Sequence, residues 1–256
     1  MTREDIKQYR LMDNFFMKIF FSKSIEAVQL ILQVILDRSD IEVTSVKVES
    51  DLCNLAGKSV VLDIHAKDSS EREFDVEIQR SSSGASPQRA GYHLSQMHSH
   101  MLDKNEDYST LKDAYVIFIT ETDTIGEGAP ISVFETQNVI NHRKFDDKRH
   151  IIYVNGKARC HDTELGRLME DFFCEDPNQI NYPEIRARFK YLKETKEGEK
   201  ELMDYEEKYT KAGEDKKQLE IAINLINLGT VSLEDIATAT GLDIDKVREL
   251  AGQVAI

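Results

Sequence analysis

The sequence predicts an α/β fold in which a central mixed sheet is flanked by helices and followed by a small helical tail. Two short segments, 60–64 and 73–79, alternate apolar and polar residues with a period of two, as half-buried strands do. The run 113–120 is apolar almost throughout, which indicates a strand buried on both faces. Apolar residues recur at helical spacing across 8–21, so this segment is expected to be a helix.

Further helices and strands are expected around these segments. Ser24 can cap a helix that runs to about Leu36. The second alternating segment is followed by a loop rich in Ser and Gly, 81–87. The remaining expected elements are a helix over 88–102 and short strands at 43–48, 131–134 and 150–154, of which the last two are candidates to pair.

The composition changes from Asp176 onward. A strongly charged helical stretch covers 184–211, and an amphipathic tail follows it. In the tail, Ser232 begins a helix that Gly241 ends, and another helix starts directly afterwards, an arrangement that resembles a helix-turn-helix. The predicted organisation is a core domain of residues 1–175, a charged helical connector of residues 176–213 and a helical tail of residues 214–256.

Composition limits the class of protein. At 256 residues, of which 40% are hydrophobic, the chain can bury a core. Its 3 cysteines stand far apart without a CxxC pair, which predicts a reducing compartment and neither a disulfide framework nor a zinc ribbon. The N-terminus does not read as a signal peptide, and no apolar run reaches about 18 residues. We therefore expect a cytoplasmic protein without a membrane partner.

The two alternating segments carry an unusual set of acids. Asp75, Glu77 and Gln79 share one face of the second segment, while Asp63 interrupts the apolar first segment. A hairpin centred near Ser70 would place Asp63 opposite Glu77, with Cβ atoms roughly 4.5–5.5 Å apart. Two carboxylates at that distance repel unless they share a proton or a cation. The spacing therefore predicts a site for a divalent metal such as Mg²⁺, provided that this register holds.

This pattern resembles the PD-(D/E)xK nuclease motif, in which an Asp on one strand is followed by an acid, any residue and a Lys on the next. The corresponding residues here are Asp63 and Glu77-Ile78-Gln79, so Gln replaces the Lys. The chain resembles in particular the recombination-promoting nuclease and putative transposase branch of that superfamily. The features that carry this resemblance, in order, are Asp13-x-x-Phe16-x-x-x-Phe20, the acidic strand pair, Arg89 and Tyr92 with Tyr108 and Leu111 after them, and a tail with Gly229 and the segment 236–242.

The resemblance implies a restriction-endonuclease-like core and a metal-dependent DNA endonuclease linked to mobile-element recombination or to defence against foreign DNA. Asp63, Glu77 and the backbone carbonyl of Ile78 would hold Mg²⁺ or Mn²⁺. Gln79 would hydrogen-bond the attacking water but bring no charge. Asp13 would be a second ligand or would orient a water; alternatively, it is an acid favoured by the positive end of its helix.

The resemblance also assigns a substrate contact. Arg89 and Tyr92 lie three residues apart and share a helix face, so Arg89 would contact a phosphate. The alternative is a surface arginine beside a packing tyrosine.

Two other kinds of site are disfavoured. A zinc site of His65, His93, His98 and His100 is disfavoured because His98 and His100 face different sides of a helix. A catalytic nucleophile at Cys160-His161-Asp162 is disfavoured because side chains of adjacent residues rarely meet in a productive geometry.

Net charge supports the alternatives to a DNA nuclease. The chain carries −14, whereas proteins that bind DNA present basic surfaces. The tail from Glu214 to Ile256 holds eight acids against four Lys or Arg, which favours packing, self-association into a homo-oligomer or a protein partner over DNA. A nuclease fold with decayed catalysis, marked by Gln79 and acting as an oligomerising or regulatory module, is the second hypothesis, and an RNA-directed nuclease is the third.

Overall fold

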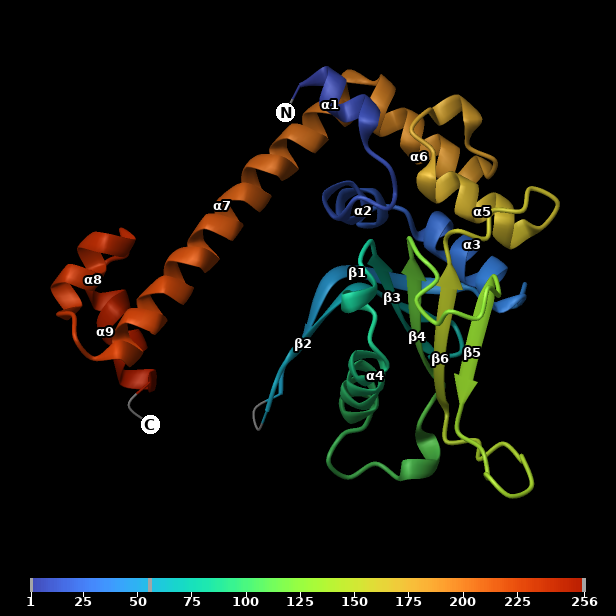
Figure 1. Cartoon of the computed structure of the whole chain (residues 1–256), viewed down its shortest axis with the longest axis horizontal. Coiled ribbons are helices and arrows are strands. Elements are labelled where there is room, and N and C mark those ends of the chain that lie inside the picture. Colours follow the sequence, from blue (N-terminus) through green and yellow to red (C-terminus); the bar gives the residue numbers. More distant parts are fainter. Residues whose placement is uncertain (1, 55–56, 255–256) are drawn as a thin grey trace. The chain divides into compact units, whose positions relative to one another are not determined.

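The computed structural model describes residues 2–54 and 57–254, and it confirms the predicted fold class: a six-stranded mixed sheet flanked by helices, with further helices at the C-terminus (Figure 1). The strands are β1 (Val43–Leu52), β2 (Val60–Asp68), β3 (Glu73–Gln79), β4 (Ala114–Thr120), β5 (Ile131–Glu135) and β6 (Arg149–Asn155). The helices are α1 (Arg3–Gln8), α2 (Asn14–Phe21), α3 (Ile25–Leu36), α4 (Pro87–Met101), α5 (Glu164–Phe173), α6 (Pro183–Glu194), α7 (Lys196–Leu228), α8 (Leu233–Thr240) and α9 (Ile244–Val254).

The sheet order is β1-β2-β3-β4-β6-β5. The central strands β3, β4 and β6 run parallel, while β1, β2 and β5 are antiparallel to their neighbours. All seven residues of β4 are buried, as expected of a strand covered on both faces. The predicted pairing of the two short strands after it is confirmed by the β5–β6 ladder.

The β2–β3 hairpin has the predicted register. His65 pairs with Asp75 and Ile64 with Val76, so the next step along the hairpin sets Asp63 opposite Glu77. Asp68 holds the turn, because its carboxylate accepts hydrogen bonds from the backbone N–H groups of Ser70 and Arg72 and from the Arg72 side chain. A buried carboxylate whose oxygens are satisfied in this way keeps the hairpin from slipping.

Helix α4 packs against the sheet, and α2, α3, α5 and α6 form a second group, of which α2 and α3 also contact the sheet at β1 (Figure 1). Aromatic side chains join that second group; the rings of Phe16 on α2 and Phe189 on α6 pack edge to face with centroids 5.1 Å apart. Within the described part of the chain, no single helix is long and apolar enough to cross a membrane. Helices α2 and α3, which are bent by 109° relative to each other, are long and apolar enough for a membrane span only when they are taken together.

The helices differ from those predicted in three places. The expected helix over 8–21 begins only at Asn14, because a turn separates α1 from α2. Helix α5 was not predicted. The charged stretch 184–211 is divided between α6 and α7, where Thr195 is extended and its hydroxyl donates to the carbonyl of Tyr191. Charge patterning alone does not reveal such a break, since both helices present charged outer faces.

The chain divides into two compact units, Met1–Glu199 and Lys200–Ile256. The second has its own core, in which Ala222 of α7 packs with Ile236 of α8 and Val247 of α9. Ser232 accepts a hydrogen bond at the start of α8, and Gly241 ends that helix in the left-handed conformation at φ 72°, so both predicted caps are confirmed. The predicted domain limits at 175 and 213 stay a prediction, because compactness alone does not define a domain.

Lys193, on α6, is a buried lysine that ties three chain segments together. Its ammonium donates to the carbonyl oxygens of Lys7 at 2.9 Å, Tyr9 at 2.5 Å and Glu175 at 2.7 Å. An ammonium group has three donors, so each finds an acceptor. The same group lies 4.6 Å from the centroid of the Phe189 ring. These contacts hold the N-terminal segment and the segment after α5 against α6.

Replacing Lys193 with Met is expected to lower the free energy of unfolding by about 2–4 kcal/mol, because three carbonyl groups lose a charged donor. Urea denaturation measures the effect. Lys196→Met, at an exposed position at the start of α7, is the matched control and should change stability by no more than about 0.5 kcal/mol. Equal stability of the two variants would contradict the role of these hydrogen bonds.

Candidate active site

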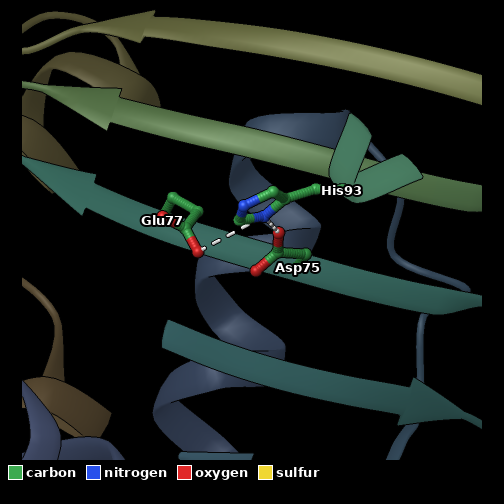
Figure 2. A group of neighbouring side chains, drawn as sticks. All are labelled: Asp75, Glu77 and His93. Atoms are coloured by element: carbon green, nitrogen blue, oxygen red, sulfur yellow. Dashed lines mark hydrogen bonds and ion pairs between the residues drawn. The ribbon is translucent and has the colours of Figure 1, made fainter. Parts of the chain in front are cut away.

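Strand β3 and helix α4 bring together two acids and a histidine. Figure 2 shows the carboxylates of Asp75 and Glu77 directed toward the ring of His93. Nδ1 of His93 lies 2.9 Å from Asp75 Oδ2 and 3.7 Å from Glu77 Oε1. One ligand atom of each residue lies within 4.8 Å of the other two, and all three side chains are buried. This geometry is that of a candidate metal site.

Asp63 is brought to the edge of this group by the hairpin register. Its backbone N–H donates to Glu77 Oε1 at 3.2 Å, so the two predicted acids do lie opposite one another. Its half-buried carboxylate is outside the three-residue group, which contains Asp75 and His93 in addition to Glu77. The negative charge of Asp63 nevertheless raises the pKa of both Asp75 and Glu77.

Arg89 and Gln79 complete the surroundings of Glu77. The guanidinium of Arg89 forms a short ion pair with Glu77 Oε2 and donates from Nε to His93 Nε2 at 3.2 Å. A third bond runs from Nη1 to the carbonyl of Gly84 at 3.0 Å. The amide of Gln79 donates to the same Glu77 oxygen at 3.3 Å. The buried carboxylate of Glu77 therefore binds a cation and an amide at a single oxygen, Oε2.

The loop between β3 and α4 is built to permit this arrangement. Ser86 accepts a hydrogen bond from the backbone of Arg89, and Pro87 occupies the first turn, so α4 begins at a defined position. A Cβ atom on Gly84 would lie 2.2 Å from Oε1 of Gln79 and 3.0 Å from its Cδ. A side chain at 84 would therefore require the flexible Gln79 side chain to move from its present position.

The group contains more carboxylates than cations, and this imbalance shifts the pKa values of its members. Burial first, then the charges of Asp75 and Asp63, raise the pKa of Glu77 to about 8. Burial raises the pKa of Asp75 well above its usual value, and burial also raises that of Asp63 despite the nearby Arg89. Burial lowers the pKa of His93, which keeps its imidazole neutral.

One carboxylate oxygen of the group is buried without a hydrogen-bond donor among the described residues. This oxygen is Oδ1 of Asp75. Three carboxylates, those of Asp63, Asp75 and Glu77, share the guanidinium of Arg89, and the charge of Lys18 also lowers the pKa of Asp63. Buried carboxylates are stable only when paired, protonated or bound to a metal. The donor set and the unpaired oxygen therefore fit a divalent cation.

The remaining predicted residues lie around this group. Tyr92 lines an open groove of about 670 Å³ beside Arg89 and His93, and its hydroxyl forms a short hydrogen bond to the carbonyl of Lys58. The Asp13 carboxylate lies elsewhere: it accepts from the backbone of Arg10 at 2.8 Å and pairs with Arg80 at 3.2 Å. It is not a member of the three-residue group, and it makes no side-chain cap on α2.

Residues 10–222 match the family model of the PD-(D/E)XK nuclease family transposases. The chain belongs to that family. No curated protein and no solved structure matches the chain. Nucleases of the PD-(D/E)XK family typically use divalent metals, and the acidic group between β3 and α4 supplies suitable ligands.

Two members of the site in this PD-(D/E)XK protein were not predicted as ligands. Asp75 shares the Glu77 face of β3 by its period of two, so a signal for it existed. His93 lies four residues after Arg89 and thus on the same helix face, but nothing local indicates that this face meets β3. The other three histidines of the disfavoured zinc site make hydrogen bonds elsewhere. His65 bonds to Glu73, His98 to the carbonyl of Lys148, and His100 to the carbonyl of Gln96.

The raised pKa of Glu77 predicts how stability depends on pH in the absence of metal. Because the pKa rises from 4.5 to about 8 on folding, the folded chain binds more protons than the unfolded chain within that window. The free energy of unfolding should therefore fall as pH rises from 5 to 8, by at most about 1.4 kcal/mol per pH unit for one proton. Glu77→Gln should weaken this fall, whereas Glu26→Gln, at an exposed site on α3, should not. Urea denaturation in a chelator across that range measures both, and parallel curves for wild type and Glu77→Gln would contradict the assignment.

Proposed function

We propose that this family member is a metal-dependent DNA endonuclease that hydrolyses phosphodiester bonds, with a role in mobile-element recombination or in defence against foreign DNA. The observation that carries the proposal is the buried acidic group in which Oδ1 of Asp75 has no donor among the described residues and three carboxylates share the guanidinium of Arg89. Burying these acids costs folding free energy. Such a cost is expected where the acids serve a bound cation.

Asp63, Glu77 and the backbone carbonyl of Ile78 would hold Mg²⁺ or Mn²⁺, with Asp75 next to Glu77 on β3. When bound, the cation polarises a phosphoryl oxygen and lowers the pKa of a water molecule. Oxygen ligands of this kind are those that Mg²⁺ prefers. The hairpin register and the burial of Glu77 support this ligand set, because they hold the two acids opposite one another before any ion arrives.

The protein's own residues would bind and orient the substrate. The groove next to the acidic group is lined by Lys58, Arg89 and Tyr92, so it presents two cations to an incoming phosphate. Gln79 would orient a water through its amide, which already lies against Glu77. The positive charge that a Lys would bring from β3 is brought to the same carboxylate by Arg89 from α4.

The tail is the proposed site of self-association into a homo-oligomer. Ile221 and Leu228 on α7 are 42% and 66% exposed, and they lie seven residues apart on one helix face. The tail carries a net charge of −4, which disfavours phosphate contacts. An exposed apolar strip on an acidic helix supports contact with a second copy of the chain rather than with DNA.

Cleavage of supercoiled plasmid DNA tests the proposed activity. We expect nicking that requires Mg²⁺ or Mn²⁺ and that falls at least about a hundredfold in Asp63→Asn and in Glu77→Gln, since each variant removes a charge from the site. Glu26→Gln is the matched control and should cut like the wild type. Cleavage that survives both substitutions would place the active site elsewhere.

Absence of cleavage has two distinguishable meanings. Calorimetry with Mn²⁺ on the same proteins would separate them. Binding that Glu77→Gln abolishes, without cleavage of plasmid or of a single-stranded RNA, would favour the decayed, regulatory alternative. Cleavage of the RNA alone would identify an RNA-directed nuclease.

Self-association is tested by light scattering coupled to size exclusion. We expect the wild type to exceed the mass of one chain, and Leu228→Glu to lower the mass because it places a charge on the exposed apolar strip. Lys217→Gln, at an exposed position on the same helix, lowers the net charge by the same one unit and should leave the mass unchanged. A wild type that is monomeric at high concentration would contradict this role for the tail.

A further inference from the structure

We infer that Arg89 determines which metal ion the site accepts, by holding His93 in a tautomer that cannot ligate. The inference rests on the proposed metal site, on the side of Glu77 where Asp75 and His93 also offer ligand atoms. It assigns to Arg89 a positioning role, exerted through His93, that is separate from any contact with phosphate.

The donors around His93 assign its tautomer. Arg89 Nε carries a hydrogen and cannot accept, so the 3.2 Å contact makes His93 Nε2 the acceptor. A neutral imidazole has one N–H and one lone pair. The hydrogen therefore lies on Nδ1, which donates to Asp75 Oδ2 at 2.9 Å. Both bonds are satisfied by one tautomer only.

The nitrogen that carries the hydrogen is the one that faces the acids. Nδ1 lies between Asp75 and Glu77, at 2.9 Å and 3.7 Å from their oxygens, and it is the nitrogen that would join them around a cation (Figure 2). Because a protonated nitrogen offers no lone pair, His93 cannot ligate while Arg89 holds Nε2. The site then presents oxygen atoms alone.

The position of Arg89 is itself secured from several directions. Its guanidinium is paired with Glu77 and donates to the Gly84 carbonyl, and its backbone is bonded to the hydroxyl of Ser86 at the start of α4. With three of its donor groups engaged by different elements, the side chain is held in one orientation. The tautomer of His93 is thus imposed by the loop and the helix start.

The consequence concerns ion selection. An all-oxygen set suits Mg²⁺ and Mn²⁺, whereas an imidazole nitrogen added to two carboxylates favours Zn²⁺ and Co²⁺. Without Arg89, Nε2 is free to carry the hydrogen and Nδ1 can ligate beside Asp75 and Glu77. Loss of Arg89 should therefore turn an oxygen site into a mixed nitrogen and oxygen site.

Two spectroscopic measurements test this inference on the full chain. Long-range ¹H–¹⁵N correlation of the histidine rings in the metal-free protein reports the tautomer, and electron spin echo modulation of bound Mn²⁺ reports nitrogen ligation. The wild type should show the Nδ1–H form of His93 and no ligating nitrogen. Arg89→Met should lose the fixed tautomer, show nitrogen coupling, and bind Zn²⁺ at least about tenfold more tightly than the wild type does.

Three further variants make the test specific. Arg89→Leu also removes every donor from His93 Nε2 but with a branched side chain, so it should behave like Arg89→Met even if the latter folds poorly. Arg149→Met is the matched control, because Arg149 also contacts α4, at the Gly91 carbonyl and Ser95, but not the acidic group. It should match the wild type. His93→Gln in the Arg89→Met background should abolish the nitrogen coupling and the gain in Zn²⁺ affinity.

The outcomes separate this inference from the proposed function. Nitrogen coupling from His93 in the wild type, or an unchanged tautomer in both Arg89 variants, would overturn the role of Arg89 while leaving the metal site intact. Failure of every variant to bind Mn²⁺ or Zn²⁺ would overturn the metal site, and the inference with it.

Discussion

The burial of Asp75 and Glu77 between β3 and α4 is the constraint on which the rest of the site depends. Carboxylates removed from water cost several kcal/mol each unless they are compensated. Helix α4 supplies the compensation through Arg89 and His93, so its start, its rotation and the loop before it are all restricted. Gly84 and Ser86 contribute to the same purpose, the first by leaving room for Gln79 and the second by capping the helix.

The Gln that replaces Lys in the PD-(D/E)xK pattern of this chain is accompanied by an arginine from another element. Gln79 brings no charge to the position where the pattern has Lys, yet Glu77 is still paired with a cation, because Arg89 reaches it from α4. The compensation remains incomplete, since Oδ1 of Asp75 has no donor within residues 2–54 and 57–254 and the pKa of Glu77 rises to about 8. This residual imbalance supports the proposal that the site binds a cation.

Much of the fold follows from local pattern. The period of two in 73–79 and the polar turn before it were sufficient to predict the β2–β3 register, because a slip of one residue would turn the buried faces outward. Ser232 and Gly241 predicted the limits of α8 through their capping chemistry. The break between α6 and α7 was not predicted, since charged residues are frequent on both sides of it and their frequency marks no helix boundary.

For the site, the sequence by itself determined that Asp63 and Glu77 lie opposite one another and that Asp75 shares the Glu77 face. Only the tertiary structure decided that His93 and Arg89 meet these acids, and that Asp13 pairs with Arg80 instead. The physical reason is that periodicity fixes which residues share a face within one element. Which face of a helix meets which strand depends on packing between elements that are distant in the chain.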